Sequence, residues 1–176
     1  MRIIAGALKG RTLKQPKGSV TRPTQGMLRG AVFNICQNEV EGARFLDLFA
    51  GSGAMGLEAL SRGASLAVFV EQNRQALACI RDNIAAFGVE SRAEVMPMPV
   101  ERALKVLAGR QFDLIYIDPP YDLSVDLAAL SSFVAPQGTV FLEERADPKR
   151  QETLIPGLQK QQTRRFGSTA LTLFSV

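Results

Sequence analysis

The segment of this sequence best suited to carry out chemistry is Asp118-Pro119-Pro120-Tyr121. It directly follows the apolar residues 114–117, which predict a buried strand whose carboxyl end lies at the ligand-binding edge of an open α/β sheet. The prolines fix the backbone, so the Asp118 carboxylate and the Pro119 carbonyl can both accept hydrogen bonds from one exocyclic amine. Two such acceptors stabilise the positive charge that develops on an amine during methylation. Tyr121 offers an aromatic face for a base, and we predict that these four residues form a catalytic site.

A glycine-rich loop is the second candidate site. Gly51, Gly53 and Gly56 follow the spacing G-x-G-x-x-G, between the apolar residues 45–49 and a predicted helix. The first two glycines permit a tight turn and close approach of the backbone to a ligand, and the third permits close packing of helix on strand. Glu71 comes 18 residues after Gly53, where it can hydrogen-bond a ribose diol. The loop and this acid together predict a nucleoside-bearing cofactor.

The charge of the cofactor separates two candidates. A nicotinamide dinucleotide needs its pyrophosphate at the helix N-terminus, whereas S-adenosylmethionine carries a cationic sulfonium and an α-amino group. Asp47 lies four residues before Gly51, where its carboxylate can face the methionine moiety or, alternatively, brace the loop as a hydrogen-bond acceptor. The D-x-F-x-G-x-G form of this segment resembles motif I of class I methyltransferases. We therefore expect S-adenosylmethionine as the cofactor.

The composition removes several other chemistries. The 176 residues contain no histidine and only two cysteines, Cys36 and Cys79. A Ser-His-Asp or Cys-His nucleophile is therefore impossible, and the usual zinc sites cannot be assembled, so we expect no metal. Two isolated cysteines also predict free thiols rather than a disulfide framework. No apolar run approaches the roughly 20 residues that span a bilayer, and the start lacks a secretion signal, so we expect a soluble, cytoplasmic protein.

Positive charge is concentrated near the N-terminus. The net charge is +4, yet residues 1–30 hold seven cations and no acid, which leaves a net charge of −3 on the remainder. Glycines and prolines within residues 6–18 predict a hairpin over residues 2–14 and an ordered loop. A basic arm of this kind predicts a polyanionic partner, with a solvated charged face as the alternative. The candidate contacts to nucleic acid are Arg2, Lys9, Arg11, Lys14 and Arg22.

These sites need a scaffold of alternating strands and helices. Short apolar runs predict five strands, over residues 45–49, 66–70, 93–96, 114–117 and 139–142. Helical spacing and capping residues predict helices over residues 24–36, 54–62, 73–87 and 101–107. Residues 159–165 and 169–174 predict two final strands joined by a tight turn. The pattern is that of an α/β fold with a parallel sheet, an antiparallel edge, a basic extension over residues 1–24 and one domain over residues 25–176.

Together, these motifs resemble one protein family over nearly the whole chain. The resemblance covers residues 2–24, 31–34, 46–53, 56–64, 118–121 and 165–171. The combination resembles the RsmD family of bacterial 16S ribosomal RNA guanine-N2 methyltransferases. It implies a class I, Rossmann-like methyltransferase fold, S-adenosylmethionine as methyl donor, and a guanine of 16S rRNA as substrate, within a 30S subunit or an assembly intermediate. It also implies that residues 118–121 hold the target base and that the 2–24 segment helps to grip RNA.

The resemblance also implies a set of cofactor-binding residues. By position these are Asp47, Phe49, Ala50, Gly51, Ser52, Gly53 and Glu71. After the third predicted strand the family often has an Asp or Asn that meets the adenine of the cofactor, whereas this sequence has Pro99. Adenine recognition would then rest on the backbone around Val100. In the first predicted helix, charged residues of the family are replaced by Gly26, Met27 and Gly30.

Three other interpretations stay open at this stage. A DNA adenine-N6 methyltransferase would share both motifs, but such enzymes usually carry a target-recognition domain for which this sequence has no room. A non-catalytic RNA-binding module would explain the basic arm alone, with Asp118 as a capping acid in a stiff turn and the glycine loop as an ordinary connection. A nicotinamide oxidoreductase would explain the glycine loop but not the Asp-Pro-Pro-Tyr segment.

Overall fold

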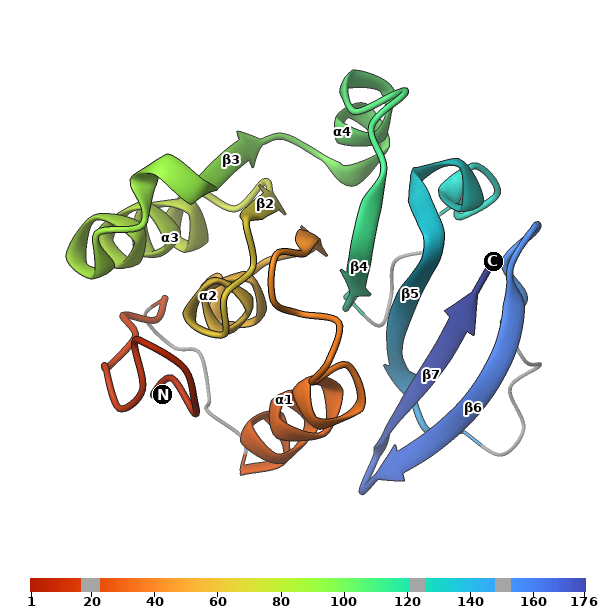
Figure 1. The fold of residues 1–176 in the computed structure, drawn as a ribbon, viewed down its shortest axis with the longest axis horizontal. Coiled ribbons are helices and arrows are strands. Elements are labelled where there is room, and N and C mark those ends of the chain that lie inside the picture. Colours follow the sequence, from red (N-terminus) through yellow and green to blue (C-terminus); the bar gives the residue numbers. More distant parts are fainter. Residues whose placement is uncertain (17–22, 121–125, 148–152) are drawn as a thin grey trace.

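The structure of the protein is a computed structural model that describes residues 1–16, 23–120, 126–147 and 153–176. Its centre is a seven-stranded sheet with the strand order β3-β2-β1-β4-β5-β7-β6 (Figure 1). The strands are β1 (Arg44–Leu48), β2 (Leu66–Glu71), β3 (Ala93–Pro97), β4 (Phe112–Ile117), β5 (Val134–Arg145), β6 (Gln159–Phe166) and β7 (Thr169–Ser175). The helices are α1 (Pro23–Ile35), α2 (Ala54–Ser61), α3 (Arg74–Phe87) and α4 (Val100–Val106), with short 3-10 turns η1 (Glu90–Arg92) and η2 (Leu130–Phe133).

The sheet has the mixed character that the sequence predicted. The first five strands pair in parallel, β1 with β2 and β4, β2 with β3, and β4 with β5. β7 pairs antiparallel with β5, and β6 pairs antiparallel with β7, so the last two strands form the predicted antiparallel edge. The chain moves outward from β1 to β3 and then returns to β4 on the other side of β1. Ligands of open α/β sheets bind at such a reversal of strand order.

Helices cover both faces of the sheet, as expected for strands that are apolar throughout. α1, α2 and α3 pack on one face, where Phe45 and Phe69 belong to the core. α4 and η2 pack on the other face, where Leu46 and Val68 belong to a second core. Neighbouring residues of a strand therefore serve opposite cores, as the alternation of side chains requires. No helix in the described part of the chain is long and apolar enough to cross a membrane.

The N-terminal segment lies against α2 and α3. The predicted hairpin is present, with its pairing limited within the described residues to one bridge, between Arg2 and Thr12. Ile3 and Leu13 are buried in the core that contains the first three helices. A Cβ on Gly6 would lie 1.9 Å from the Ser61 carbonyl oxygen, so only glycine allows this close approach to α2. Whether residues 1–24 act as a unit apart from residues 25–176 stays a prediction.

Most element boundaries lie within one or two residues of those predicted, and those of β5 differ by more. α1 begins at Pro23 rather than at Thr24, because proline suits the first turn of a helix, where its missing N–H costs nothing. β5 begins before and ends after the predicted residues 139–142, since its polar end still pairs with β7 as far as Arg145 and Thr169. The longer β5 carries Glu143 into the region described next.

Candidate active site

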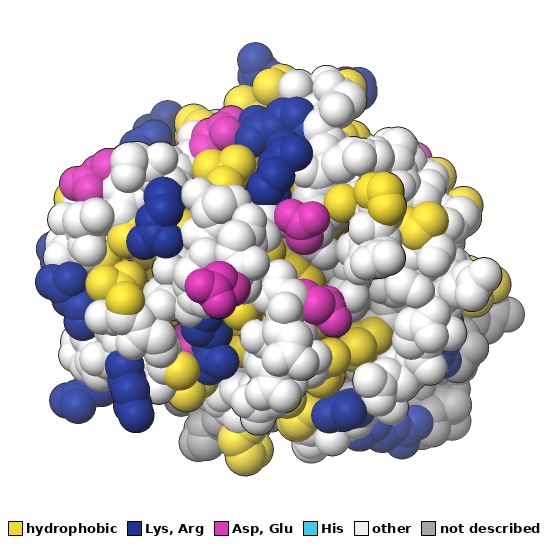
Figure 2. All heavy atoms as spheres, viewed as in Figure 1, with side chains coloured by type: hydrophobic (Ala, Val, Ile, Leu, Met, Phe, Trp, Pro, Cys, Tyr) yellow, Lys and Arg dark blue, Asp and Glu magenta, His cyan; other side chains and the backbone are white. Residues whose placement is uncertain are grey.

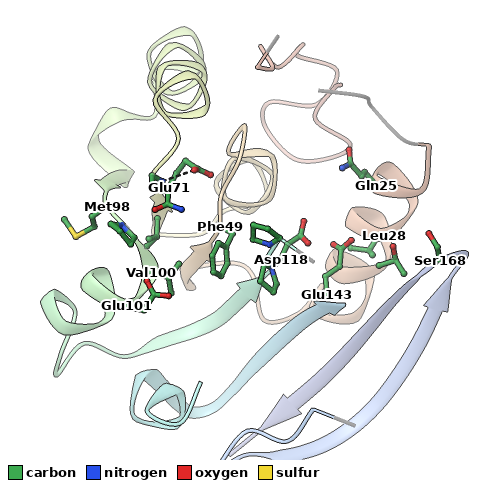
Figure 3. A pocket seen from close by; sticks show the side chains of 16 residues that line it. Gln25, Leu28, Phe49, Glu71, Met98, Val100, Glu101, Asp118, Glu143 and Ser168 are labelled. Atoms are coloured by element: carbon green, nitrogen blue, oxygen red, sulfur yellow. Dashed lines mark hydrogen bonds between the residues drawn. The ribbon is translucent and has the colours of Figure 1, made fainter. Parts of the chain in front are cut away.

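Three carboxylates meet where β1, β4 and β5 lie side by side. The parallel register of β1 and β4 places Asp47 opposite Tyr116. That of β4 and β5 pairs Ile117 with Leu142, so the next residues, Asp118 and Glu143, are neighbours. Because partners in a parallel pair and residues two apart in a strand face the same side, all three acids face α1 and α2. Asp47 is fully buried, and Asp118 and Glu143 are half-buried. Figure 3 shows Asp118 and Glu143 next to each other at the ends of their strands.

The carboxyl ends of the strands border a cavity of about 640 Å³, which is a common size for a small-molecule site. Its described wall contains four acids, Glu71, Glu101, Asp118 and Glu143, and no Lys or Arg (Figure 3). A second cavity of about 220 Å³ shares Phe49, Asp118 and Glu143 with the first. Both cavities therefore have the same pair of carboxylates in their walls.

The glycine-rich loop has the backbone geometry that its sequence predicted. Gly51 and Gly53 have φ values of 55° and 78°, in the left-handed region that favours glycine. A Cβ on Gly56 would lie 2.3 Å from the ring of Phe69, so this glycine lets α2 pack directly on β2. The Asn83 side chain of α3 donates a hydrogen bond of 3.2 Å to the Ser52 carbonyl. The loop is thus fixed by β2 beneath α2 and by α3 beside it.

Glu71 ends β2 and holds the glycine loop in place. Its Oε2 accepts a hydrogen bond of 2.8 Å from the Gly51 N–H. Its Oε1 accepts hydrogen bonds from the backbone N–H groups of Gln72 and Asn73 at 2.8 and 2.7 Å. A carboxylate offers about four acceptor positions, which leaves one for a ligand hydroxyl. The same side chain can therefore fix the loop and accept a hydrogen bond from a ribose.

Asp47 braces the beginning of α2. Its Oδ2 accepts a hydrogen bond of 3.0 Å from the Gly56 N–H, which is the bracing role that the sequence left open, and it also lines the smaller cavity. Burial is the main cause that raises the pKa of Asp47 to about 8, the Gly56 N–H opposes this shift, and the charges of Asp118 and Glu71 add to it. A cation in the smaller cavity would favour the ionised form of this side chain.

Asp118 and Glu143 form a like-charged pair beside Tyr116. The Tyr116 hydroxyl donates a hydrogen bond to the Glu143 carboxylate, and no donor among the described residues contacts the Asp118 carboxylate. Burial, reinforced by Glu143, raises the pKa of Asp118 to about 7. Burial also raises the pKa of Glu143, against the effect of the Tyr116 hydrogen bond, and it raises the pKa of Tyr116. Carboxylates that are withdrawn from solvent without a cation and that line a cavity are typical of a functional site.

The structure brings most of the predicted cofactor residues to the two cavities. Those in the wall of the larger cavity are Phe49, Glu71 and Val100. Those in the wall of the smaller one are Asp47, Phe49, Ala50, Gly51 and Ser52. Gly53 precedes α2 and lines neither cavity. Of the predicted catalytic residues, Asp118, Pro119 and Pro120 line the larger cavity, and Tyr121 lies outside the described residues.

Sequence reasoning missed several residues that line the two cavities. Among them are Gln25, Met98, Glu101, Tyr116 and Glu143. Glu143 follows an apolar strand as Asp118 does, so a polar residue at the end of a predicted strand was the available signal. Tyr116 lies inside a predicted strand, and its sequence pattern gives no sign that its hydroxyl meets an acid. Pro99 precedes α4 and lines the larger cavity together with Met98.

The candidate RNA-binding cations differ in how far other residues engage them. Arg2 and Lys9 are exposed. Arg11 lies over the Phe87 ring, 4.9 Å from its centroid, and donates a hydrogen bond of 2.7 Å to the Ala86 carbonyl. Lys14 forms an exposed ion pair of 3.1 Å with Asp82. Arg22 lies outside the described residues.

One cation of the N-terminal region is not available to a partner. Arg29 counts toward the basic charge of residues 1–30, but only 3% of it is exposed. Its Nε lies 3.5 Å from Glu58 Oε2, and burial is the main cause that lowers its pKa. This correction follows from α1, which turns Arg29 inward toward α2. The charge that the arm presents to solvent is smaller than the sequence count.

The residues around the two cavities fit S-adenosylmethionine. Four acids and no described cation line the larger cavity, a wall that repels a pyrophosphate and attracts a sulfonium or an ammonium group. Glu71 has one acceptor position left for a ribose hydroxyl, and Phe49, Met98 and Val100 supply apolar surface for a purine. The acidic wall therefore disfavours a nicotinamide dinucleotide, the other cofactor compatible with the glycine loop, because its pyrophosphate is negatively charged.

Both the sheet topology and this acidic cavity are those of class I, S-adenosylmethionine-dependent methyltransferases. Residues 1–175 match the family described as Conserved hypothetical protein 95. Ribosomal RNA small subunit methyltransferase D of Escherichia coli K12 is 30% identical over 154 residues, which cover 84% of this chain and 76% of that protein. The chain belongs to this family, the RsmD family.

Further relatives agree in sequence and in fold. YlbH of Bacillus subtilis is 42% identical over 123 residues, which cover 69% of this chain and 67% of that protein. The solved structure of yhhF from Escherichia coli superposes with a TM-score of 0.87 at 29% identity and covers 99% of this chain and 96% of that one. The structure of TTHA0928 from Thermus thermophilus has a TM-score of 0.80 at 34% identity and covers 100% and 99% of the two chains.

Proposed function

We propose that this protein transfers a methyl group from S-adenosylmethionine to the exocyclic N2 amine of a guanine in 16S ribosomal RNA. The observation that carries the proposal is the position of Asp118, whose half-buried carboxylate follows β4, precedes two prolines and lines the acidic cavity. The name of the Escherichia coli relative, a small subunit ribosomal RNA methyltransferase, supports the same substrate. The protein acts in the cytoplasm on RNA that is held in a 30S subunit or an assembly intermediate.

The chain's own acceptors activate the amine. The lone pair of a guanine amine is delocalised into the ring, so the nitrogen is a weak nucleophile. Asp118 and the Pro119 carbonyl accept hydrogen bonds from its two N–H groups and stabilise the positive charge that develops as the nitrogen–carbon bond forms. The bound cofactor supplies the methyl group, whose bond to sulfur breaks with the electron pair left on sulfur. The surplus proton leaves the amine along its hydrogen bond to Asp118, a carboxylate whose pKa of about 7 suits it to accept a proton.

The basic face of the N-terminal segment supports an RNA substrate. Figure 2 shows Lys and Arg side chains on the side of the molecule that the N-terminal segment and α3 occupy in Figure 1, and acidic side chains nearer the middle. Arg2, Lys9, Arg11 and Lys14 are exposed on this segment. In this arrangement the phosphates contact the basic face and a single base enters the cavity, whose acids repel phosphate.

The test is methyl transfer by the whole protein from labelled S-adenosylmethionine to 30S particles, to free 16S rRNA and to duplex DNA, with primer extension to map the modified base. We expect label on one guanine of the ribosomal RNA. Asp118→Ala should lower the turnover at least about 10³-fold while cofactor affinity changes by no more than a few-fold, because the acceptor acts mainly on the charge that develops during methyl transfer. The control is Glu90→Ala, which removes an exposed acid at the opposite end of the sheet and should leave turnover unchanged.

Each alternative function has its own outcome in this experiment. Label on adenine in duplex DNA would replace the proposal with a DNA methyltransferase. A non-catalytic RNA-binding module predicts RNA binding with no saturable binding of S-adenosylmethionine in calorimetry. Near-normal turnover of Asp118→Ala would refute the role assigned to that carboxylate.

A further inference from the structure

Three hydrogen-bond acceptors lie close together in the wall of the active site. The register of β4 and β5 puts Glu143 beside Asp118, and both side chains line both cavities. Figure 3 shows the two carboxyl groups turned to the same side, toward the space near Gln25 and Leu28. The Pro119 carbonyl adds a third acceptor, because the following proline has no N–H with which to continue a ladder. No Lys or Arg is found among the described residues of the larger cavity, whereas Arg29 lines the smaller one.

We propose that Glu143 is the residue that recognises guanine, by accepting a hydrogen bond from its N1–H while Asp118 and Pro119 hold the N2 amine. This inference rests on the proposed function and names the residue that gives it base specificity. Guanine is the amino-bearing base whose ring nitrogen next to the amine carries a hydrogen. In adenine and cytosine the corresponding ring nitrogen is an acceptor, which would face the Glu143 carboxylate without a proton between them. Acceptors at these three positions therefore suit guanine and reject the other two bases.

Tyr116 prepares Glu143 for this role. Its hydroxyl donates to Oε2 of Glu143, which leaves the other carboxylate oxygen for a ligand. A donor on a carboxylate favours the ionised form, so this hydrogen bond opposes the effect of burial, which raises the pKa of Glu143. Tyr116 is itself buried between β1 and β5 and cannot swing toward solvent. We assign Tyr116 as a positioning residue that acts through Glu143.

The test removes the hydrogen on N1 of the target base and keeps its N2 amine. Particles are assembled from 16S rRNA that carries either guanine or 2-aminopurine at the nucleotide mapped by primer extension, since 2-aminopurine keeps the N2 amine and lacks the N1–H. The wild-type protein should methylate guanine at least about 100-fold more efficiently, measured as kcat/KM, than 2-aminopurine. Glu143→Gln should lower the rate on guanine and reduce this preference to below about 10-fold, because an amide can either accept from or donate to N1.

Two measurements separate recognition from a merely structural role. Glu143→Gln and Tyr116→Phe should keep the cofactor affinity of the wild type within a few-fold, and Tyr116→Phe should reduce the base preference less than Glu143→Gln does. Because 2-aminopurine also lacks O6, the change in preference caused by the variant, rather than the preference itself, reports on N1. Glu90→Gln is the matched control and should leave the preference unchanged.

The outcomes distinguish this inference from the function on which it rests. Failure of the wild type to methylate guanine would remove the proposed function, and the inference with it. Normal methylation of guanine with a preference over 2-aminopurine of less than about 3-fold would leave the function standing and overturn the role of Glu143. An equal loss by Glu143→Gln on both bases would overturn it as well, because that result describes a general catalytic or folding defect rather than recognition.

Discussion

Acids withdrawn from solvent occur in two regions of this molecule and are treated in opposite ways. Glu58 on α2 is completely buried and saturated with donors. It accepts hydrogen bonds from the backbone N–H groups of Ile4 and Ala5 at 2.8 and 3.0 Å, and it forms ion pairs with Arg29 and Arg62 at 3.5 and 2.9 Å. Every lone pair that faces the protein has a partner, and the acid joins the N-terminal segment to the helix.

Asp118 and Glu143 are half-buried, but no cation within the described residues pairs with them. Their one described donor is the Tyr116 hydroxyl, on Glu143, and they face a cavity rather than a neighbouring segment. Leaving two half-buried carboxylates without cationic partners costs folding free energy, which a structural acid would avoid. The two roles can therefore be told apart by their partners. The acid of the scaffold has a donor on every side, and the acids of the site keep acceptor positions open for a ligand.

The largest loss of stability is expected when Glu58, the saturated acid, is changed. Glu58→Gln leaves Arg29 buried beside a neutral amide and should lower the free energy of unfolding by about 3–5 kcal/mol. For a domain of this size, that change lowers the Tm by roughly 6–20 °C in calorimetry. Asp118→Asn is the matched control at the incomplete site and should leave the Tm unchanged or higher at about pH 8, because it removes a charge that has no ionic partner.

A comparable fall of the Tm in both variants would show that Asp118, too, is structurally paired. It would contradict the distinction between the two kinds of acid. An unchanged Tm in Glu58→Gln would contradict it from the other side.

Gly56 lies between the two regions and should affect both when changed. Its N–H donates to Asp47 of the site, and Glu58 follows it by two residues on the same helix. A Cβ at this position would overlap the buried ring of Phe69, so Gly56→Ala should cost about 1–3 kcal/mol and weaken cofactor binding together with stability. Urea unfolding and calorimetric titration of S-adenosylmethionine measure the two effects.

Matched variants identify the cause of the Gly56 effect. A Cβ on Gly30 of α1 would meet nothing within 4 Å, so Gly30→Ala should stabilise the protein by up to about 1 kcal/mol. The cost of Gly56→Ala should be smaller in a Phe69→Leu background, where the overlapping ring is gone. An equal cost in both backgrounds would show that the overlap is not the cause.

The incomplete site should give the protein a distinctive dependence on pH. The pKa of Asp118 is raised to about 7 and that of Asp47 to about 8, whereas the same groups titrate near about 4 in the unfolded chain. The folded state therefore keeps protons that the unfolded state has lost, and stability without cofactor should fall as the pH rises from about 4 to 8. A cationic cofactor prefers the ionised groups, so its affinity should rise over the upper part of the same range, by about 3–10-fold between about pH 6 and 8.

Calorimetric titration at several pH values checks this dependence. Asp118→Asn should flatten both curves, because one of the titrating groups is gone. A stability without cofactor that rises with pH between about 5 and 8 would contradict the assignment of these acids as unpaired. An affinity for S-adenosylmethionine that does not change with pH would contradict their role in attracting its positive charge.

The sequence predicted the scaffold well because its signals are local. Apolar runs, caps and glycines give the order of strands and helices, and the position of Asp118 after a strand gives one half of the site. Glu143 was missed because its strand ends in charged residues that look like a loop, and the pairing of this end depends on distant residues of β7 such as Leu171. Glu58 was missed because nothing in its helix shows that Ile4 and Ala5 lie against it. Partners that are distant in sequence decide which buried acid is saturated, and a single sequence does not display them.

The smallest expected effects concern the basic arm, where the structure ranks the cations. Arg2 and Lys9 are exposed and, within the described part of the chain, their side chains have no partner, so both are free to meet phosphates. Lys14 already pairs with Asp82, with 66% of its side chain exposed, an ion pair worth at most about 1 kcal/mol. The double variant Arg2→Ala, Lys9→Ala should reduce the slope of log affinity against log salt by about 2, and Lys14→Ala by less than about 1.

Filter binding of 16S rRNA between roughly 50 and 200 mM salt measures these slopes. Methyl transfer at saturating RNA should stay unchanged in both variants, because the arm serves binding and the incomplete acids serve chemistry. A slope that the double variant does not alter would return Arg2 and Lys9 to the role of a solvated charged face. A loss of turnover at saturating RNA would instead mean that the arm positions the base in the cavity, and the two regions would then be coupled through α2 rather than separate.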